Sequence, residues 1–209
     1  MLLVRGSDPW ELLLMRRPRG ADFAPGAYVF PGGVVHAEDA QWGDDIAAAA
    51  VRELFEEVGI LLARAGRRFA HDRDSARIRG LVASGSSFGD ALRSGGLKPA
   101  LDRLVLLARW VTPAQLSRRY DARFYLARLP ARQTVRVQPD EVSDWVWASP
   151  DRALRDPEIT LVYATRRVLE SVAAGEQVNG LFKRARRQKH VPIVEPRMVR
   201  TGSGWEISE

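Results

Sequence analysis

Short apolar runs with the spacing of β-strands occupy the first part of the chain. Leu2 to Arg5 and Trp10 to Arg16 are rich in β-prone residues and flank a polar Gly-Ser-Asp-Pro turn, so we expect a β-hairpin. Pro18 to Gly26 is rich in Pro, Gly and Asp and predicts a loop. Two short strands are expected after it, over Ala27 to Phe30 and Val34 to His36.

The pattern then changes to the spacing of an amphipathic helix. Asp44 or Asp45 can cap its start, and Gly59 can end it in the left-handed conformation. Apolar residues recur three and four positions apart on one face, which we expect to pack on a sheet. These residues are Ala47, Val51, Leu54, Phe55 and Val58.

The middle of the chain alternates between polar and apolar stretches. Arg64 to Pro99 is polar and rich in Gly and Ser, which predicts an insertion or lid with at most short helices. Leu104 to Val111, Arg123 to Leu129 and Val142 to Ala148 are expected strands, and a helix from about Ile159 to Ala173 follows. One domain over residues 1–178, including the insertion at about 64–99, is the predicted organisation.

Residues 179–209 form a predicted basic C-terminal extension. It can end in a hairpin from Val191 to Val199, a turn at Gly202 to Gly204, and Trp205 to Ile207. The run Lys183 to His190 can be a nucleic-acid patch, but it lacks interleaved aromatic residues and any base-reading motif. We therefore favour a solvated helix end or linker, and we do not expect nucleic acid as a partner.

Composition restricts the chemistry that is available. The 209 residues include no cysteine, which excludes disulfides, thiolate zinc sites and cysteine nucleophiles. The three histidines are not at ligand spacing, so a bound metal would need oxygen ligands and would be a hard cation. The net charge of +6 is compatible with an anionic substrate. Charges, Gly6 and Pro9 interrupt the N-terminal apolar stretch, so we expect a cytoplasmic protein without a membrane span.

Three glutamates occupy one face of the predicted helix. Glu56 and Glu57 lie three and four residues after Glu53, a spacing that places all three on one side of a helix. Arg52 stands four residues before Glu56. We expect the three carboxylates to converge on one point, where a cation would neutralise their repulsion. Oxygen ligands at high charge density suit Mg²⁺ or Mn²⁺. The alternative interpretation is an acidic helix face exposed to solvent.

The context of these glutamates resembles a known motif. Residues 52–60 are Arg-Glu-Leu-Phe-Glu-Glu-Val-Gly-Ile, with Phe-Pro-Gly-Gly upstream at residues 30–33. The pattern resembles the Nudix box, GX5EX7REUXEEXGU, with an insertion of about five residues between Gly33 and Arg52. The first glutamate of the motif then corresponds to Asp39, counted forward from Gly33, or to Asp44, counted back from Arg52. We favour Asp44, because a carboxylate there also caps the helix.

The resemblance implies a fold and a cofactor. A Nudix domain is an α/β/α sandwich with a mixed central sheet, here with an inserted loop and helical segment. Mg²⁺ or Mn²⁺ would be the cofactor. Its implied ligands are Glu53, Glu56 and Glu57, helped by a backbone carbonyl of the Gly32-Gly33 turn, with Gly32 as the candidate.

The resemblance also implies catalytic roles. In this family water attacks a phosphorus of a diphosphate while metal ions neutralise the developing charge. Glu53 and Glu57 are implied in catalysis, and Arg52 would orient the carboxylates. Glu53 is the first choice for the general base, with Asp140 or Glu141 as the alternative.

Four further segments, residues 12–17, 23–34, 110–113 and 118–125, resemble the Nudix branch that includes acyl-CoA diphosphatases. The implied substrate is a small nucleoside diphosphate derivative, with CoA or acyl-CoA as the leading hypothesis. The alternative is a catalytically silent Nudix-fold module that senses a ligand or binds RNA. The complete set of core box residues favours the enzyme, and a homodimer remains compatible with it.

Four arginines are candidate substrate contacts. Arg16 and Arg17 end a predicted strand, where one of the two can face a cleft; the alternative is surface solubility. Arg119 and Arg123 alternate with Asp121 and can bind phosphate or ribose, or belong to an exposed ion-paired strand. Two tryptophans, Trp145 and Trp147, share one face of a predicted strand, and we expect both to lie in the core.

Overall fold

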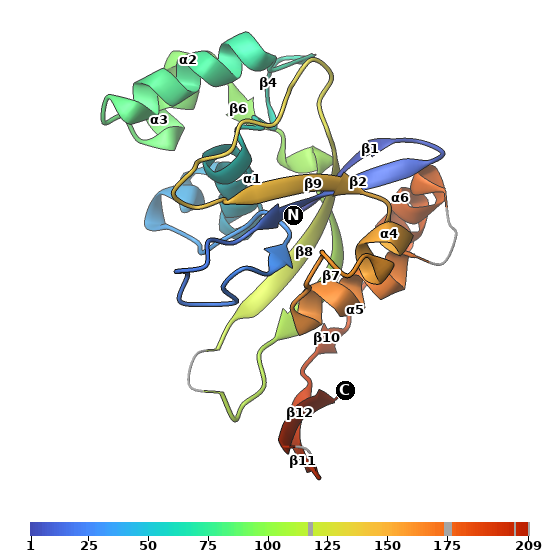
Figure 1. The fold of residues 1–209 in the computed structure, drawn as a ribbon. Coiled ribbons are helices and arrows are strands. Elements are labelled where there is room, and N and C mark those ends of the chain that lie inside the picture. The colour runs from blue at the N-terminus through green and yellow to red at the C-terminus, as the bar shows by residue number, and fades with distance from the viewer. Residues whose placement is uncertain (117–118, 174–176, 203, 209) are drawn as a thin grey trace.

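The computed structural model describes residues 1–116, 119–173, 177–202 and 204–208. Its centre is a seven-stranded sheet in the order β10-β7-β8-β1-β2-β3, with β9 also paired to β2 (Figure 1). The strands are β1 (Leu2–Gly6), β2 (Trp10–Arg16), β3 (Tyr28–Val29), β7 (Val105–Val111), β8 (Asp121–Arg128), β9 (Asp144–Ala148) and β10 (Ile193–Val194). The β1–β8 and β10–β7 pairs are parallel, whereas the other pairs are antiparallel. The predicted mixed sheet and N-terminal hairpin are confirmed.

Alternating side chains on the central strands divide the interior into two cores. On β2, Leu13 and Met15 belong to the core that contains the apolar face of α1 (Asp45–Val58). Leu12 and Leu14 belong to the other core, with three helices. These helices are α4 (Pro150–Arg155), α5 (Tyr163–Val172) and α6 (Val178–Arg187). Both faces of the sheet are thus covered, and the predicted α/β/α sandwich is confirmed.

Two residues set the limits of α1 as predicted. Asp44 is the N-cap, and its carboxylate accepts a hydrogen bond from the Ala47 amide at 3.0 Å. Gly59 follows the last turn with a φ of 73°, in the left-handed region that favours glycine. A Cβ at this position would lie 2.8 Å from the Arg136 carbonyl oxygen, so packing also demands glycine.

The inserted segment forms more regular structure than its composition predicts. It contains a three-stranded sheet of β4 (Ala63–Ala65), β5 (Arg68–Phe69) and β6 (Lys98–Pro99), and the helices α2 (Asp72–Ala83) and α3 (Phe88–Ser94). The expectation of at most short helices is wrong for α2, which has 12 residues. Buried Ile78 and Leu92 join the α1 core, and Phe88 stacks on Phe55 with ring centroids 5.3 Å apart. These apolar contacts anchor the segment beside α1.

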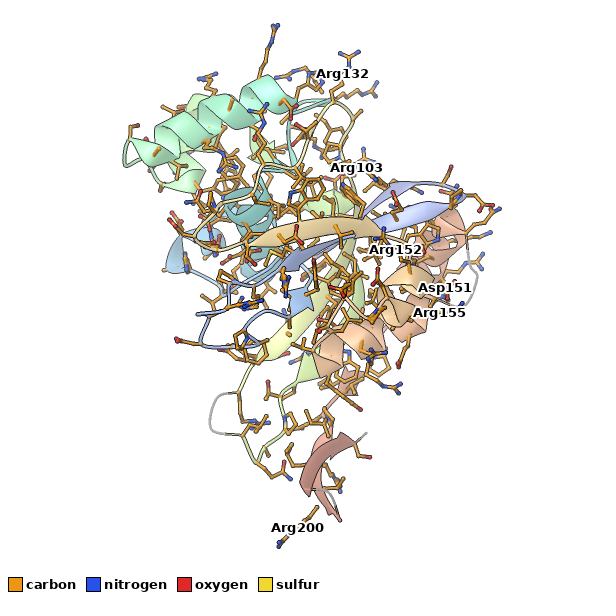
Figure 2. All side chains as sticks on the ribbon, in the orientation of Figure 1. Arg103, Arg132, Asp151, Arg152, Arg155 and Arg200 are labelled. Carbon is orange, nitrogen blue, oxygen red and sulfur yellow. The ribbon has the colours of Figure 1, made fainter. Side chains whose placement is uncertain are left out.

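Other boundaries differ from expectation for local reasons. Val34 to His36 is not a strand, and a 3-10 helix, η1 (Ala37–Trp42), follows it. The helix expected from Ile159 begins only at Tyr163, because the Thr160 carbonyl accepts a hydrogen bond from the Tyr28 amide at 2.8 Å. The short helix α4 was not expected. Its exposed face carries Asp151, Arg152 and Arg155, labelled in Figure 2.

Only one of the two tryptophans on β9 lies in the core. Trp147 is 8% exposed and packs with the α1 core, whereas Trp145 is 38% exposed. The expectation of burial is therefore wrong for Trp145. Sharing one face of a strand does not ensure equal burial, because the start of β9 at Asp144 and Trp145 is exposed, whereas its end at Trp147 and Ala148 is buried.

The C-terminal extension is a helix followed by short strands. The strands β11 (Arg197–Thr201) and β12 (Gly204–Ser208) follow α6 and β10. One further element, the 3-10 helix η2 (Leu101–Arg103), lies between β6 and β7. β11 and β12 pair antiparallel as the predicted hairpin and project away from the main body (Figure 1). Ser203, in the predicted turn, lies outside the described residues. Across the described ranges, no helix is both long and apolar enough to span a bilayer.

The cap of α1 leads to a stability prediction. Asp44→Ala should lower the free energy of unfolding by about 1 kcal/mol, because the Ala47 amide loses its side-chain partner. The melting temperature should then fall by about 2–4 °C in thermal denaturation. Asp45→Ala, one position on and exposed, is the control and should have a smaller effect; an equal loss would contradict the capping role of Asp44.

Candidate active site

Arg52 lies at the centre of the candidate site. Its side chain is completely buried on α1, and all three of its nitrogens make hydrogen bonds. Nη1 donates to Glu53 Oε1 at 2.9 Å and to Glu56 Oε2 at 2.7 Å. Nη2 donates to the Val34 carbonyl at 2.7 Å. The guanidinium therefore holds two of the predicted metal-binding carboxylates and the chain that follows the glycine turn.

Asp39, rather than Asp44, is the acidic partner of Arg52. Its side chain is 2% exposed, and its two oxygens accept hydrogen bonds from Nε and Nη2, each at 3.2 Å. Asp39 Oδ2 also accepts from the His36 amide at 2.8 Å. The preference for Asp44 is wrong, because Asp44 is committed to capping α1. The 3-10 turn η1 brings Asp39 back to the helix, and the count forward from Gly33 identified the correct residue.

This arrangement keeps a fully buried arginine charged. Burial alone would lower the pKa of Arg52, but the hydrogen bonds that Arg52 donates to Asp39 and the charges of Glu53 and Glu56 raise it above its ordinary value. A buried charge is tolerated when it is paired and hydrogen-bonded on all sides. Arg52 thus contacts two of the implied metal ligands, and its role in orienting them for catalysis stays a prediction.

The Gly32-Gly33 turn lies directly against the carboxylates. The Gly32 amide donates to Glu57 Oε2 at 2.8 Å. A Cβ on Gly33 would lie 2.5 Å from Glu53 Oε1, so only glycine allows this approach without moving the carboxylate. This amide contact is separate from the implied role of the Gly32 carbonyl as a metal ligand, which stays a prediction.

The carboxylates share one electrostatic environment. Burial raises the pKa of Glu57 to about 8; the Gly32 amide opposes this shift, and the charge of Glu53 adds to it. Burial also raises the pKa of Glu56, against the effect of Arg52. Both carboxylates are thus buried beside other negative charges, and a hard divalent cation would stabilise their charged forms.

The expected convergence of three carboxylates on one point is not seen. In the part of the chain that the structure describes, no three His, Asp or Glu side chains are grouped as a ready metal site. The reason is that Arg52 holds Glu53 and Glu56, while the Gly32 amide holds Glu57. Each of these three hydrogen bonds engages one of the two oxygens of its carboxylate.

The loop before β9 brings one of the two alternative bases to the site. The Gln138 amide donates to the Glu57 carbonyl at 2.9 Å, which docks this loop on the end of α1. The charge of Glu141 contributes to the raised pKa of Glu57, so the two carboxylates are electrostatically coupled. Both Asp140 and Glu141 are exposed.

The four candidate arginines divide into two pairs. Arg16 Nε donates to the Gly26 carbonyl at 3.0 Å and Arg17 Nε to the Phe23 carbonyl at 2.7 Å, so both support the loop before β3. Arg119 pairs with Glu195 at 2.5 Å, outside any strand. Arg123 lies on β8 opposite Arg109 of β7. Arg118, which belongs to one of the resembling segments, lies outside the described residues.

A polar pair near this loop was missed from the sequence. Tyr28 Oη donates to Asp144 Oδ2 at 2.7 Å, and Arg16 lies over the Tyr28 ring at 5.8 Å. Burial and this hydrogen bond raise the pKa of Tyr28 to about 12. The three residues are register neighbours across β3, β2 and β9, a relation that depends on strand pairing. No local motif could have indicated it.

Comparison with known proteins agrees with the fold and the family that the sequence indicated. A family model of the NUDT19 Nudix domain matches residues 41–163, more than half of the chain. Nudix hydrolase 7 of Caenorhabditis elegans is 34% identical over 141 residues, covering 67% of this chain and 47% of that protein. The acyl-coenzyme A diphosphatase NUDT19 of Gallus gallus is 26% identical over 213 residues, covering 71% and 56%. The chain thus spans about half the length of these curated relatives.

A solved structure shows the same architecture. The crystal structure of a NUDIX hydrolase from Alicyclobacillus acidocaldarius superposes with a TM-score of 0.71 and 26% identity, covering 85% of this chain and 90% of that one. Together with the glutamate helix and its glycine turn, these matches define the class: the chain belongs to the Nudix hydrolase family. Within that family it resembles the acyl-CoA diphosphatase branch, as its sequence segments indicated.

The contact between Asp39 and Arg52 leads to a second stability prediction. Asp39→Ala should lower the free energy of unfolding by about 2–3 kcal/mol, because it removes one partner of a buried charge. Chemical denaturation would measure the loss. Glu38→Ala is the matched control on η1, and its effect should be small. Asp39→Glu should retain part of the stability; equal stability of Asp39→Ala and Glu38→Ala would contradict the assignment of Asp39.

The close approach of Gly33 to Glu53 predicts an effect on cation binding. Gly33→Ala should displace the Glu53 carboxylate and weaken the affinity for Mn²⁺ by at least about tenfold. Titration calorimetry would measure it. Gly20→Ala is the control, since a Cβ there meets no atom within 4 Å. If Gly33→Ala bound Mn²⁺ as tightly as the parent protein, the turn would not position this carboxylate.

Proposed function

We propose that this protein is a metal-dependent hydrolase that cleaves the diphosphate linkage of a nucleoside diphosphate derivative, with CoA or acyl-CoA as the substrate. One observation carries the proposal: three glutamates of α1 lie between a buried arginine and a close glycine turn. The names of the matched relatives, a nudix hydrolase and an acyl-coenzyme A diphosphatase, support the reaction and the substrate class.

The donor set fits a hard divalent cation. Glu53, Glu56 and Glu57 are neighbouring carboxylates, burial raises the pKa of Glu56 and Glu57, and imidazole and thiolate ligands are not needed. These three residues would hold Mg²⁺ or Mn²⁺. When bound, the cation would neutralise charge that develops on the phosphate oxygens. Arg52 keeps Glu53 and Glu56 in place, and the Gly32 amide keeps Glu57 in place.

Glu53 is the proposed general base. Its side chain is partly exposed, at 12%, so it can reach a water molecule while Arg52 orients it. Glu141 is the alternative, because it is exposed and coupled to Glu57 from the neighbouring loop. Water would attack a phosphorus of the diphosphate, the base would accept the proton of that water, and the bridging P–O bond would break.

The surface beside the glycine turn supports an acylated substrate. Val34 and Val35 follow Gly33 directly and are 54% and 43% exposed. The Val34 carbonyl accepts a hydrogen bond from Arg52, which fixes Val34 at the edge of the carboxylate cluster with its apolar side chain exposed to solvent. Exposed apolar residues at the edge of a polar site suit the burial of an acyl group.

A glutamate-to-glutamine exchange tests the reaction. Glu57→Gln should abolish Mg²⁺-dependent hydrolysis, a loss on the order of 10³-fold, while the fold is retained. Product formation from CoA and acyl-CoA would be followed by chromatography, with NADH, ADP-ribose and dinucleoside polyphosphates as competing substrates. Glu38→Gln carries the same charge change outside the cluster and should remain active.

Removal of the cation provides an independent test. EDTA should abolish turnover, and Mg²⁺ or Mn²⁺ should restore it. Turnover of Glu57→Gln at the parental rate, or full activity in EDTA, would overturn the proposed reaction. Hydrolysis of another diphosphate in preference to CoA and acyl-CoA would overturn only the proposed substrate.

A further inference from the structure

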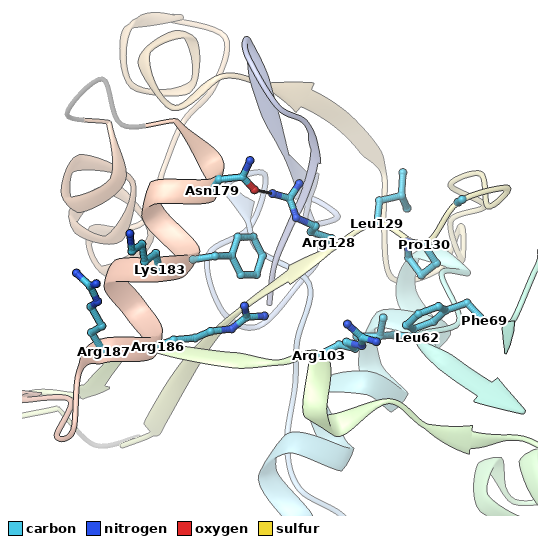
Figure 3. A pocket seen from close by; sticks show the side chains of 12 residues that line it. Leu62, Phe69, Arg103, Arg128, Leu129, Pro130, Asn179, Lys183, Arg186 and Arg187 are labelled. Carbon is cyan, nitrogen blue, oxygen red and sulfur yellow. Dashed lines mark hydrogen bonds between the residues drawn. The ribbon is translucent and has the colours of Figure 1, made fainter. Parts of the chain in front are cut away.

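A basic pocket lies between α6 and the inserted segment, away from the carboxylate cluster (Figure 3). Its volume is about 520 Å³, within the range of small-molecule sites. Arg128 at the end of β8, Arg103 of η2 and Arg186 of α6 contribute to its wall, with the rings of Phe69 and Phe182. None of the candidate metal ligands lines it. Its use is therefore not explained by the proposed reaction.

The lining is strongly cationic. Besides the three arginines, Lys183 and Arg187 line it along α6, and no aspartate or glutamate does so among the described residues. Arg103 pairs with Asp102 at 3.5 Å, and Asp102 also pairs with Arg64 at 2.9 Å. Several positive charges around one cavity repel each other, and an anion in the cavity would relieve that repulsion.

Aromatic rings hold the guanidinium groups in place. Arg128 and Arg186 lie over the Phe182 ring at 5.0 and 5.6 Å, and Arg103 lies over the Phe69 ring at 5.3 Å. Arg128 also donates to Asn179 Oδ1 at 2.7 Å. A guanidinium that stacks on a ring presents its N–H groups at its edge, which matches the oxygens of phosphate. The ordering of these side chains is thus already present in the protein.

Figure 3 shows how the arginines are directed. Arg186 extends from α6 toward the space that Arg103 faces from the opposite wall, and Arg128 of β8 turns toward Asn179 of α6. Apolar residues, including Leu62 and Pro130, complete the lining. A ligand with two phosphate groups and a compact organic part would satisfy both the cations and the apolar wall.

We propose that this pocket is a second ligand site, which binds a multiply phosphorylated small molecule such as a nucleoside bisphosphate. The inference does not depend on the proposed hydrolysis, because it uses different residues and needs no metal. It also gives a role to the basic run of α6, which the sequence alone left as a solvated helix end.

Titration calorimetry in EDTA would test the second site. Adenosine 3′,5′-bisphosphate and inorganic pyrophosphate are the probes, and adenosine is the uncharged comparison. We expect the bisphosphate to bind, its affinity to fall as salt rises, and adenosine not to bind. Glu57→Gln should bind the bisphosphate as the parent does, which separates this site from the carboxylate cluster.

Charge-removing variants locate the binding. Arg103→Gln/Arg186→Gln should weaken the bisphosphate by at least about tenfold, because two phosphate-facing guanidiniums are lost. Arg73→Gln/Arg166→Gln removes the same charge from α2 and α5 and should bind as the parent protein does. If the double variant unfolds, the single variant Arg103→Gln, at an exposed position, provides the same test and should also weaken binding of the bisphosphate. Equal weakening by both double variants, unchanged binding in both pocket variants, or tighter binding of a short RNA than of the bisphosphate would overturn the proposal.

Discussion

The pairing of the buried Arg52 guanidinium is the interaction on which the candidate site depends. It joins α1 to η1 through Asp39, and to the chain after the glycine turn through the Val34 carbonyl. A buried arginine is stable only when every N–H finds an acceptor, so these segments must remain together. The apolar face of α1 provides the rigid support, because Leu54, Phe55 and Val58 are packed in the core beneath.

The same interaction explains why acidic groups can gather on this helix. Arg52 neutralises part of the charge of Glu53 and Glu56, and the Gly32 amide stabilises Glu57 from the other side. Burial, with the charge of Glu53 added to it, still raises the pKa of Glu57 above its ordinary value. The contacts that stabilise this part of the fold therefore also assemble the carboxylates that would hold a cation.

The sequence predicted best what depends on local chemistry. The limits of α1 followed from Asp44 and Gly59, and the family followed from the spacing of residues 52–60. It failed where a contact depends on the path of the chain. Asp39 reaches Arg52 only because η1 turns back to the helix, and the Tyr28–Asp144 pair exists only through the register of three strands. The pocket beside α6 likewise needs residues from β5, η2 and β8 to meet.

The 3-10 turn between the glycines and α1 has a consequence for how this motif varies among proteins. Asp39 and Arg52 are joined by direct hydrogen bonds, so the number of residues between them is not itself constrained. Each doubling of a flexible loop adds only about 0.6 kcal/mol to its closure. The length of this loop can thus drift during evolution while the carboxylate continues to meet the guanidinium, and a search that demands fixed spacing would overlook such relatives.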